Sequence, residues 1–331
     1  MSARTITLHV FASAKGGVGK STLAIACAKL LGEQGRTCVL LDADFTGTSL
    51  ADGLLLCAPI VATKQNGTPD FYAPSTRQFL SREETIRLRM RRKDATPQEE
   101  FLAPPFLNDI FLHGDLKQEC RIEALCWQHE DRGDRVLYLP SSPLGKDIGI
   151  ALGWLFRDQV FTWLQRMTWL LDGMAAQLEA LSDVVIDLPP GLHGFAHEVL
   201  VLLSYISKDR EMPSGFPAWH EQRDKLAWQA RPFLVTTPDR NDVILALEYY
   251  ARHRKDLSEL RLLLNRSVTT SIQQLREDIR AYTAVEIGLD QIPLTVIGFL
   301  SPLSKVFQDR TLRLNSEVLA LKEQLRIQEG S

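Results

Sequence analysis

The sequence predicts a single α/β domain, built on a doubly wound and mostly parallel β-sheet that helices flank on both faces. Short β-rich runs alternate with helical stretches along the chain, which is the pattern of a doubly wound sheet. Several runs are apolar almost throughout, as is typical of parallel strands covered on both faces. The expected strands cover residues 5–12, 37–42, 136–140, 183–188, 232–237, 260–265 and 294–299.

The loop after the first expected strand has the composition of a phosphate-binding loop. Residues 15–22 read Lys-Gly-Gly-Val-Gly-Lys-Ser-Thr and lead into an alanine- and leucine-rich helix that we expect to end near Gly35. Glycines let backbone N–H groups turn inward around an anion, and the helix adds the positive end of its dipole. Lys20 is then placed at the β- and γ-phosphates, and the Ser21 hydroxyl at a magnesium ion. The expected nucleotide-binding residues of the loop are Gly16, Gly17, Val18, Gly19, Lys20, Ser21 and Thr22.

The loop departs from the ordinary phosphate-loop pattern at two positions. Ala14 stands where the first glycine is usual, and a second lysine, Lys15, follows it. A chance match is the alternative to a nucleotide site, but so many constrained positions directly after a strand make chance a poor explanation. The extra lysine separates one class of nucleotide-dependent switch from the rest.

Carboxylates follow two of the expected strands. Asp42 and Asp44 end the second run, and Asp187 ends the run at 183–188. Ligands of this architecture bind at the carboxyl edge of the sheet, and an aspartate after an apolar strand is what a magnesium-holding position requires. A lone aspartate there is often only a cap or turn former. Beside a phosphate loop, the two strand ends are better explained as one site, in which Ser21, Asp44 and Asp187 serve the metal.

Bulk composition bounds the partners and the compartment. The chain has 331 residues, is 45% hydrophobic and 24% charged, and carries a formal net charge of −3, so it has no global attraction to nucleic acid or to anionic membranes. It contains no apolar run long enough to span a membrane, and because the first expected strand begins early we expect no signal peptide. Five cysteines without a C-x-x-C pair fit a reducing cytoplasm better than a disulfide framework or a zinc or iron–sulfur site.

One region interrupts the alternation of strands and helices. We expect an irregular insertion at about 51–135, which contains prolines at 59, 69, 74, 97, 104 and 105. Within it, the segment Arg82 to Lys93 has six basic and two acidic residues. The segment is either an arm that contacts the phosphates of non-specific DNA, or a solvated face or an arm that packs on an acidic partner.

Three further segments complete the predicted domain. Residues 150–181 are expected to be helical, with Trp154, Trp163 and Trp169 in core or interface packing. Residues 205–231 are interpreted as a surface excursion, and residues 305–329 as a docked C-terminal helix. That helix lacks the basic face and the large apolar anchors of a membrane-surface helix, so we do not expect a membrane partner.

Two histidines come close together after the run at 183–188. His193 and His197 have i, i+4 spacing, which would place both on one face of a helix. A metal pair is one interpretation. Two histidines without a third or fourth nearby ligand are more often surface or capping residues.

Together these motifs resemble the ParA/MinD family of deviant-Walker P-loop ATPases, which also includes the nitrogenase iron protein, the arsenite-pump ATPase and Mrp-type iron–sulfur carriers. The resemblance covers most of the chain outside 51–135 and 205–231. The matching segments, in family order, are the phosphate loop (15–22), Asp-x-Asp (42–44), Asp-Leu-Pro-Pro-Gly (187–191), Val-Thr-Thr-Pro (235–238), Leu-Asn-Arg (264–266) and Ile-Gly-Phe-Leu-Ser-Pro (297–302).

The resemblance implies a magnesium-dependent ATP hydrolase that acts as a homodimer when ATP is bound. It makes Lys15 a signature lysine that reaches the nucleotide of a second subunit, and Asp44 a switch I residue that positions the attacking water. Asp187 becomes the Walker B and switch II carboxylate. Asn265 would read the adenine with Arg266 beside it, and residues near Pro302 would line the base pocket. An unidentified protein partner is also implied.

Departures from the family leave the branch open. Many partition ATPases continue switch I as Asp-Pro-Gln-Gly-Asn, whereas this chain has Asp-Phe-Thr-Gly-Thr at 44–48. A carrier or energy-coupling ATPase like the nitrogenase iron protein or the arsenite pump is one alternative, which the absence of paired cysteines disfavours. A scaffold that binds nucleotide without turnover is the other, which the intact Lys15, Lys20, Asp44 and Asp187 disfavour.

Overall fold

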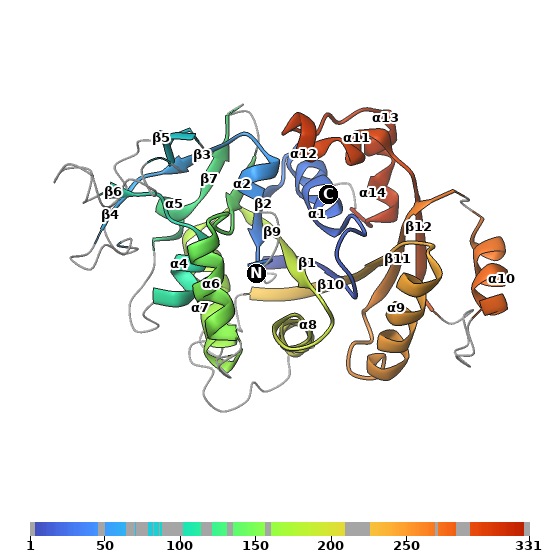
Figure 1. Cartoon of the computed structure of the whole chain (residues 1–331). Coiled ribbons are helices and arrows are strands. Elements are labelled where there is room, and N and C mark those ends of the chain that lie inside the picture. Colours follow the sequence, from blue (N-terminus) through green and yellow to red (C-terminus); the bar gives the residue numbers. More distant parts are fainter. Residues whose placement is uncertain are drawn as a thin grey trace.

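A computed structural model gives the fold of most of the chain. It describes residues 4–45, 50–63, 70, 79–81, 83–85, 87, 102–113, 121–130, 135–155, 160–208, 226–268, 271–282 and 292–327. Figure 1 shows these residues as one α/β layer arrangement with a central sheet.

The described residues form a ten-stranded sheet in the order β12-β11-β10-β1-β9-β2-β8-β7-β3-β5. Its strands are β1 (Arg4–Ser13), β2 (Thr37–Asp42), β3 (Leu56–Pro59), β5 (Phe79–Leu80), β7 (Trp127–His129), β8 (Val136–Leu139), β9 (Leu181–Pro190), β10 (Leu226–Thr236), β11 (Arg261–Ser267) and β12 (Leu294–Gly298). From β12 to β8 all neighbours are parallel, and β7, β3 and β5 extend the sheet with antiparallel pairs. A separate pair is formed by β4 (Val61–Ala62) and β6 (Leu102–Ala103). The predicted mostly parallel α/β sheet is therefore confirmed.

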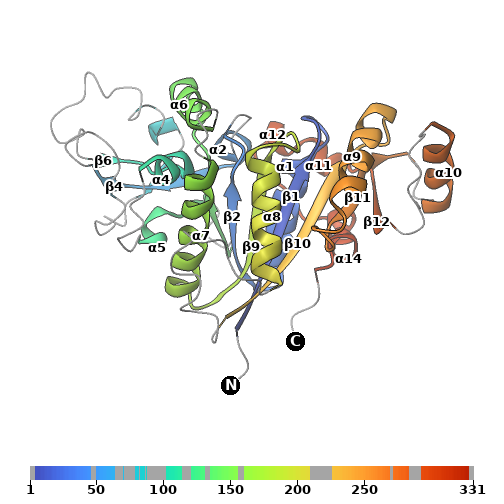
Figure 2. The ribbon, with the colours of Figure 1, turned by 90° about the horizontal axis from the view of Figure 1, so that it is seen from below.

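Helices cover both faces of this sheet, as Figure 2 shows. One face packs against α4 (Leu107–His113), α5 (Ile122–Leu125), α6 (Gly145–Leu155), α7 (Val160–Gln177), α8 (Phe195–Ser207), α9 (Arg240–His253) and α10 (Ile272–Tyr282). The other face packs against α1 (Lys20–Glu33), α2 (Leu50–Gly53) and the C-terminal segment. Side chains on a strand alternate between faces, so the apolar strands supply both cores.

Every strand expected from the sequence is present, although most of them have different ends. The bounds of β2 agree with the expected 37–42, whereas β10 starts at Leu226, before the expected 232. The reason is its partner, because β1 pairs with β10 from Arg4↔Leu226 to Ser13↔Val235 and extends the ladder. The surface excursion expected at 205–231 is therefore too wide: 205–207 belong to α8 and 226–231 to β10. Residues 209–225 lie outside the described part of the chain.

The insertion expected at 51–135 is only partly irregular. Its β3, β5 and β7 lengthen the sheet, and Leu107, Ile110 and Phe111 of α4 are buried in the main core. Of the basic segment 82–93, only residues 83–85 and 87 are among those described, so the proposed DNA-contacting arm lies largely outside them.

The tryptophan-rich helical region is confirmed as α6 and α7. Trp163 is fully buried in an aromatic cluster, with its ring 4.6 Å from that of Phe45, 5.0 Å from that of Phe111 and 5.5 Å from that of Phe195, measured between centroids. Phe45 directly follows Asp44, and Phe195 begins α8. Trp169 is half-buried against the same core, and the side chain of Trp154 lies outside the described residues.

The prediction of one continuous helix over 305–329 is wrong. The described part of the segment instead forms three short helices, α12 (Val306–Asp309), α13 (Ser316–Leu319) and α14 (Leu321–Gln324), and a further short helix, α11 (Ser301–Ser304), precedes it. Arg310 takes a left-handed conformation with φ 55° that ends α12, and Asn315 caps α13 by accepting a hydrogen bond from the Val318 N–H. The segment does dock, because Val306, Leu312, Val318, Leu321 and Leu325 are buried.

Within the residues that the structure describes, no helix has the length and hydropathy needed to cross a membrane.

One buried carboxyl group in the helical layer should make the stability of the fold depend on pH. Asp172 of α7 is 9% exposed, and its Oδ2 atom has no hydrogen-bond partner among the described residues. Burial raises the pKa of Asp172 to about 7, well above the pKa of an aspartate in the unfolded chain. The folded chain therefore binds this proton more tightly than the unfolded chain, and stability falls as the pH rises through about 7.

We predict that Asp172→Asn removes this loss of stability at high pH. The variant should gain on the order of a few kcal/mol in unfolding free energy over wild type at pH 8, and the gain should shrink towards pH 4. Urea denaturation across this pH range measures it, with the exposed Asp256→Asn as the control. A pH-independent difference would contradict the assignment.

Candidate nucleotide-binding site

The phosphate loop connects β1 to α1 at the carboxyl edge of the sheet. Gly17 and Gly19 have φ values of 81° and 87°, a region that favours glycine. Asn265 of β11 donates from Nδ2 to the Val18 carbonyl at 2.8 Å, and a Cβ on Gly19 would overlap that Nδ2 atom. The loop is therefore held from β11, two strands away from β1 in the sheet, and glycine at 19 is needed for the close approach.

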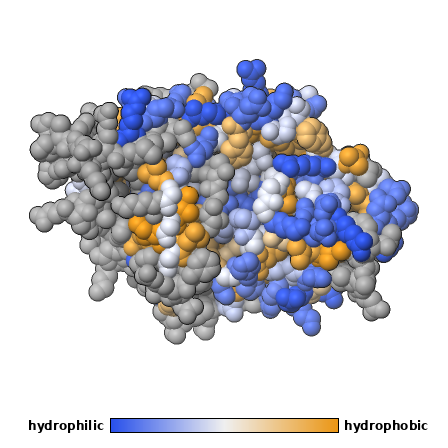
Figure 3. All heavy atoms as spheres, viewed as in Figure 1, coloured by the Kyte–Doolittle hydropathy of each residue, from blue (hydrophilic) through white to orange (hydrophobic). Residues whose placement is uncertain are grey.

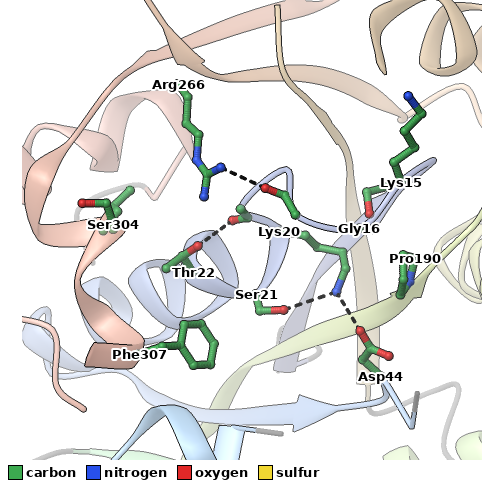
Figure 4. Close-up of a pocket in the computed structure, with 14 residues that line it drawn as sticks. Lys15, Gly16, Lys20, Ser21, Thr22, Asp44, Pro190, Arg266, Ser304 and Phe307 are labelled. Atoms are coloured by element: carbon green, nitrogen blue, oxygen red, sulfur yellow. Dashed lines mark hydrogen bonds and ion pairs between the residues drawn. The ribbon is translucent and has the colours of Figure 1, made fainter. Parts of the chain in front are cut away.

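A cavity of about 430 Å³ opens above this loop. Figure 4 shows its side chains, which come from the loop, the strand ends and the C-terminal helices. They belong to Ser13, Lys15, Gly16, Gly17, Gly19, Lys20, Ser21, Thr22, Asp44, Pro190, Arg266, Leu303, Ser304 and Phe307. A volume of this size lies in the range of small-molecule and cofactor sites.

Lys20 is the buried charge at the centre of the site. Its Nζ lies 2.5 Å from Asp187 Oδ1, 3.8 Å from Asp44 Oδ2 and 3.4 Å from the Ser21 hydroxyl. Burial raises the pKa of Asp187, and the Lys20 ammonium opposes that rise. The structure thus brings together the lysine, the hydroxyl and both carboxylates that the sequence predicted as one site.

The sheet topology explains why these groups meet. β9 lies between β1 and β2, and Asp42 of β2 is in register with Asp187 of β9. Asp44 follows just beyond the edge, while Lys20 starts the helix after β1. Parallel strands end on the same side of the sheet, so the charged side chains that follow β1, β9 and β2 lie close together.

Asp42 has a different place from Asp44. Its Oδ2 accepts hydrogen bonds from the Leu50 N–H at 2.9 Å and from the Ser141 hydroxyl at 2.7 Å. Burial raises the pKa of Asp42 to about 7, helped by the nearby Asp187 charge. This carboxyl ties α2 and the end of β8 to β2.

Lys15 points away from Lys20, as Figure 4 shows. Its Nζ forms an ion pair of 2.9 Å with Asp242 Oδ1, and its side chain is 41% exposed. Asp242 lies in the first turn of α9, where a negative charge is favourable, and also accepts a hydrogen bond from the Thr237 hydroxyl. Sequence reasoning missed Asp242, because nothing in its local pattern separates it from an ordinary helix-start acid.

Of the remaining predicted residues, only some line the cavity. Arg266 lines it and donates to the Gly17 carbonyl at 2.9 Å. Asn265 and Pro302 are not among the lining residues; Asn265 holds the loop, and Pro302 precedes the lining residue Leu303. Ser304 and Phe307 were missed, because short helical turns without a motif carry them.

The histidine pair separates in the structure. His193 lies before α8, so the two histidines do not share a helix face. His197 Nδ1 lies 2.8 Å from the Tyr249 hydroxyl, and its ring packs near that of His253. Among the described residues, no group of three or more histidine, cysteine, aspartate or glutamate side chains could hold a metal.

The oxygen donors of the site fit a magnesium ion bound together with phosphates. Magnesium prefers oxygen ligands and is usually held by one or two carboxylates plus substrate phosphates. The Ser21 hydroxyl and the carboxylates of Asp187 and Asp44 all face Lys20.

Several solved structures share this fold. The cell division ATPase MinD of Pyrococcus furiosus aligns with 98% of this chain and 99% of its own, at 15% identity and a TM-score of 0.52. MinD of Pyrococcus horikoshii, complexed with Mg-ADP, aligns with 97% of this chain and 94% of its own, at 15% identity and a TM-score of 0.51. An ATP complex of a Cyanothece McdA variant covers 100% of both chains, at 14% identity and a TM-score of 0.51.

This is the MinD-like P-loop fold. The family model described as ParA, NUBPL iron-transfer P-loop NTPase, matches residues 5–79, which include the phosphate loop and Asp44. The resemblance to the ParA/MinD family is therefore confirmed. No curated protein matches the chain.

We predict that Lys20→Ala destabilises this ParA/MinD-like fold in the absence of any ligand. Removing the lysine leaves Asp187 buried without its cation, which typically costs about 3–5 kcal/mol. Urea denaturation measures the loss, and the exposed Lys255→Ala is the control. Equal stability of the Lys20 variant and wild type would show that the Asp187 charge is compensated elsewhere.

Proposed function

We propose that this chain is an ATP hydrolase of ParA/MinD type, which binds Mg-ATP, forms a nucleotide-sandwich homodimer and acts as a slow switch on a macromolecular partner. The observation that carries the proposal is the buried Lys20, which lines the cavity, is paired with Asp187 and lies close to Asp44. Phosphoryl transfer depends mostly on positioning and charge neutralisation, and these are the groups for it.

The ion pair of Lys20 suggests how nucleotide enters this site. On binding, the Lys20 ammonium turns from Asp187 to the β- and γ-phosphates, and the N–H groups of the loop surround the same anion. Asp187 and Ser21 would hold a magnesium ion, which would supply positive charge to neutralise the phosphates. Asp44 accepts a hydrogen bond from the attacking water and orients it towards the γ-phosphorus.

Lys15 is proposed to act on the nucleotide of a second copy. Its ammonium group is half-exposed beside the cavity and forms an ion pair with Asp242. If the Lys15 ammonium leaves Asp242 and binds the phosphates of the nucleotide in a facing subunit, it adds a further positive charge at the transition state. A cation supplied in this way can raise turnover about a thousandfold or more. The rate of ATP hydrolysis would then depend on dimerisation.

Known structures of this fold support the choice of ligand. The Pyrococcus horikoshii MinD structure contains Mg-ADP, and a Cyanothece McdA variant was solved with ATP. We further propose one P-loop ATPase domain over residues 1–331, a cytoplasmic location, and an unidentified protein partner. The basic segment 82–93 stays the candidate for non-specific DNA contact.

A carrier function is the second candidate. It is favoured by the description of the matching family model, an iron-transfer P-loop NTPase. Among the described cysteines, Cys27, Cys38 and Cys126 are buried, and Cys57 is half-buried. A visible, oxygen-labile chromophore in anaerobically purified protein would support this carrier. ATP binding without phosphate release would instead support a non-hydrolysing scaffold.

We predict that Lys15→Ala keeps ATP binding but loses ATP-dependent dimerisation and hydrolysis. The lysine lies at the rim and is not needed to hold phosphate in its own subunit. Nucleotide titration, light scattering and phosphate release measure the three properties. Asp242→Ala is the matched control, since it breaks the same ion pair but leaves the lysine, and it should retain turnover. Unchanged turnover in Lys15→Ala would overturn the proposed role in trans.

We predict that Asp44→Ala binds ATP and accumulates as an ATP-bound dimer. The substitution removes the carboxylate that orients the water but leaves Lys20, Ser21 and Asp187 in place. Light scattering with ATP measures the mass, with ADP as the control. A strictly monomeric variant in ATP would contradict the prediction.

A further inference from the structure

The insertion at 51–135 contacts the backbone beside the proposed ATP site through its helix α4. The Leu107 N–H at the start of this helix donates to the Pro140 carbonyl at 2.9 Å. The next residue, Asn108, accepts a hydrogen bond of 2.7 Å from the Ser142 N–H at its Oδ1 atom. Asn108 and Ser142 are both buried. Two successive residues of α4 therefore hold the segment that follows β8.

Ser141, which lies between these two contacts, binds the carboxylate of Asp42. Its hydroxyl and its N–H donate to Asp42 Oδ2 at 2.7 Å and 3.2 Å. The same carboxylate accepts hydrogen bonds from the Leu50 N–H at 2.9 Å and from the Asp44 N–H at 3.3 Å. Asp42 is buried, so the loss of a donor would leave a buried acceptor unsatisfied. The backbone of Asp44 is therefore held by a carboxylate whose own position depends on Ser141.

The same helix also packs against the residue that follows Asp44. The rings of Phe111 in α4 and of Phe45 are both buried, and their centroids lie 5.6 Å apart. Trp163 contacts both, with its centroid 4.6 Å from that of Phe45 and 5.0 Å from that of Phe111. Because closely packed rings leave little free space, a displacement of α4 requires Phe45 to move. One helix of the insertion thus contacts the surroundings of Asp44 through hydrogen bonds and through aromatic rings.

Asn108 is an unusual residue for a position that only fills space. A buried asparagine normally satisfies both ends of its amide. Among the described residues, however, the Nδ2 atom of Asn108 has no hydrogen-bond partner. A leucine of similar volume would be easier to bury there if packing were the only requirement. The hydrogen bond to Ser142 is therefore what this asparagine contributes.

We propose that the insertion sets the rate of ATP hydrolysis, because α4 positions Asp44 through Asn108 and Phe111. Both are positioning residues, since neither lines the cavity. A partner that displaced α4 would change how Asp44 orients the attacking water, while the phosphate loop kept its contacts with the nucleotide. The inference rests on the proposed function and names the part of the chain through which that function is regulated.

The first experiment compares turnover with binding. Asn108→Leu removes the Oδ1 acceptor at similar volume. A misplacement of about 1 Å can cost about a hundredfold in rate, so we expect the kcat of this variant to fall by about tenfold or more. Its Kd for Mg-ATP should stay within about twofold of wild type, because Lys20 and the phosphate loop are unchanged. Phosphate release measures kcat and KM, and calorimetry measures Kd.

The matched control is Ile110→Val, which removes one buried methyl group from the same helix and leaves both contacts in place. It should have the kcat, KM and Kd of wild type. Phe111→Leu tests the aromatic contact separately and should also lower kcat without weakening ATP binding. Melting temperatures of all variants show which of them are folded, and Phe111→Leu decides the inference if Asn108→Leu does not fold.

The second experiment measures the ATP-bound dimer. Asn108→Leu and Phe111→Leu should accumulate as dimers in ATP, as expected of Asp44→Ala, because hydrolysis slows while ATP binding remains. A loss of stability alone would not produce this accumulation. Light scattering measures the mass in ATP, with ADP as the control.

The outcomes separate this inference from the function on which it rests. An unchanged kcat in folded Asn108→Leu and Phe111→Leu would overturn the inference and leave the proposed ATPase intact. Equal losses of kcat in Ile110→Val, or a loss of ATP affinity as large as the loss of kcat, would also overturn it, because the effect would then be general disruption. Failure of wild type to bind or to hydrolyse ATP would refute the proposed function, and this inference with it.

Discussion

The buried ammonium group of Lys20 is the constraint around which the site is organised. An unpaired charge at 5% exposure would be very costly, so the fold must supply carboxylates within reach. It does so from β9, through Asp187, and from the end of β2, through Asp44. Placing two acids and a lysine at one point requires β1, β9 and β2 to be adjacent and parallel. The order of the central strands is therefore what brings the charged groups of the site together.

The parts of the chain that surround this centre differ in how they contact it. The C-terminal turns close the cavity from one side through Leu303, Ser304 and Phe307. On the other face of the sheet, Phe45 beside Asp44 and Phe195 after Asp187 both pack on Trp163, together with Phe111 from the 51–135 insertion. A movement of the segment around Asp44 or of the segment after Asp187 would require these rings to move as well, because close-packed aromatic side chains have little free space. The insertion thereby gains a direct physical connection to the site.

Much of the fold was predictable, because its signals are local. The phosphate loop needs glycines at positive φ, and the buried parallel strands need unbroken apolar runs, so both are visible in the residues themselves. Strand ends were less predictable. β10 begins earlier than its apolar run because β1 offers a partner along its whole length. The segment 305–329 has helical periodicity, yet the left-handed Arg310 and the Asn315 cap divide it into short turns.

The sequence by itself determined which groups carry the proposed chemistry: Lys15, Lys20, Ser21, Asp44 and Asp187 stand in motifs whose spacing reflects a strand, a loop and a helix start. Only the tertiary structure decided their partners. The Asp242 carboxylate on Lys15, the Asn265 amide on the phosphate loop and the Phe307 ring against Gly53 all join segments far apart in the chain. Contacts of that kind leave no local pattern, since each depends on where the sheet brings two distant segments together.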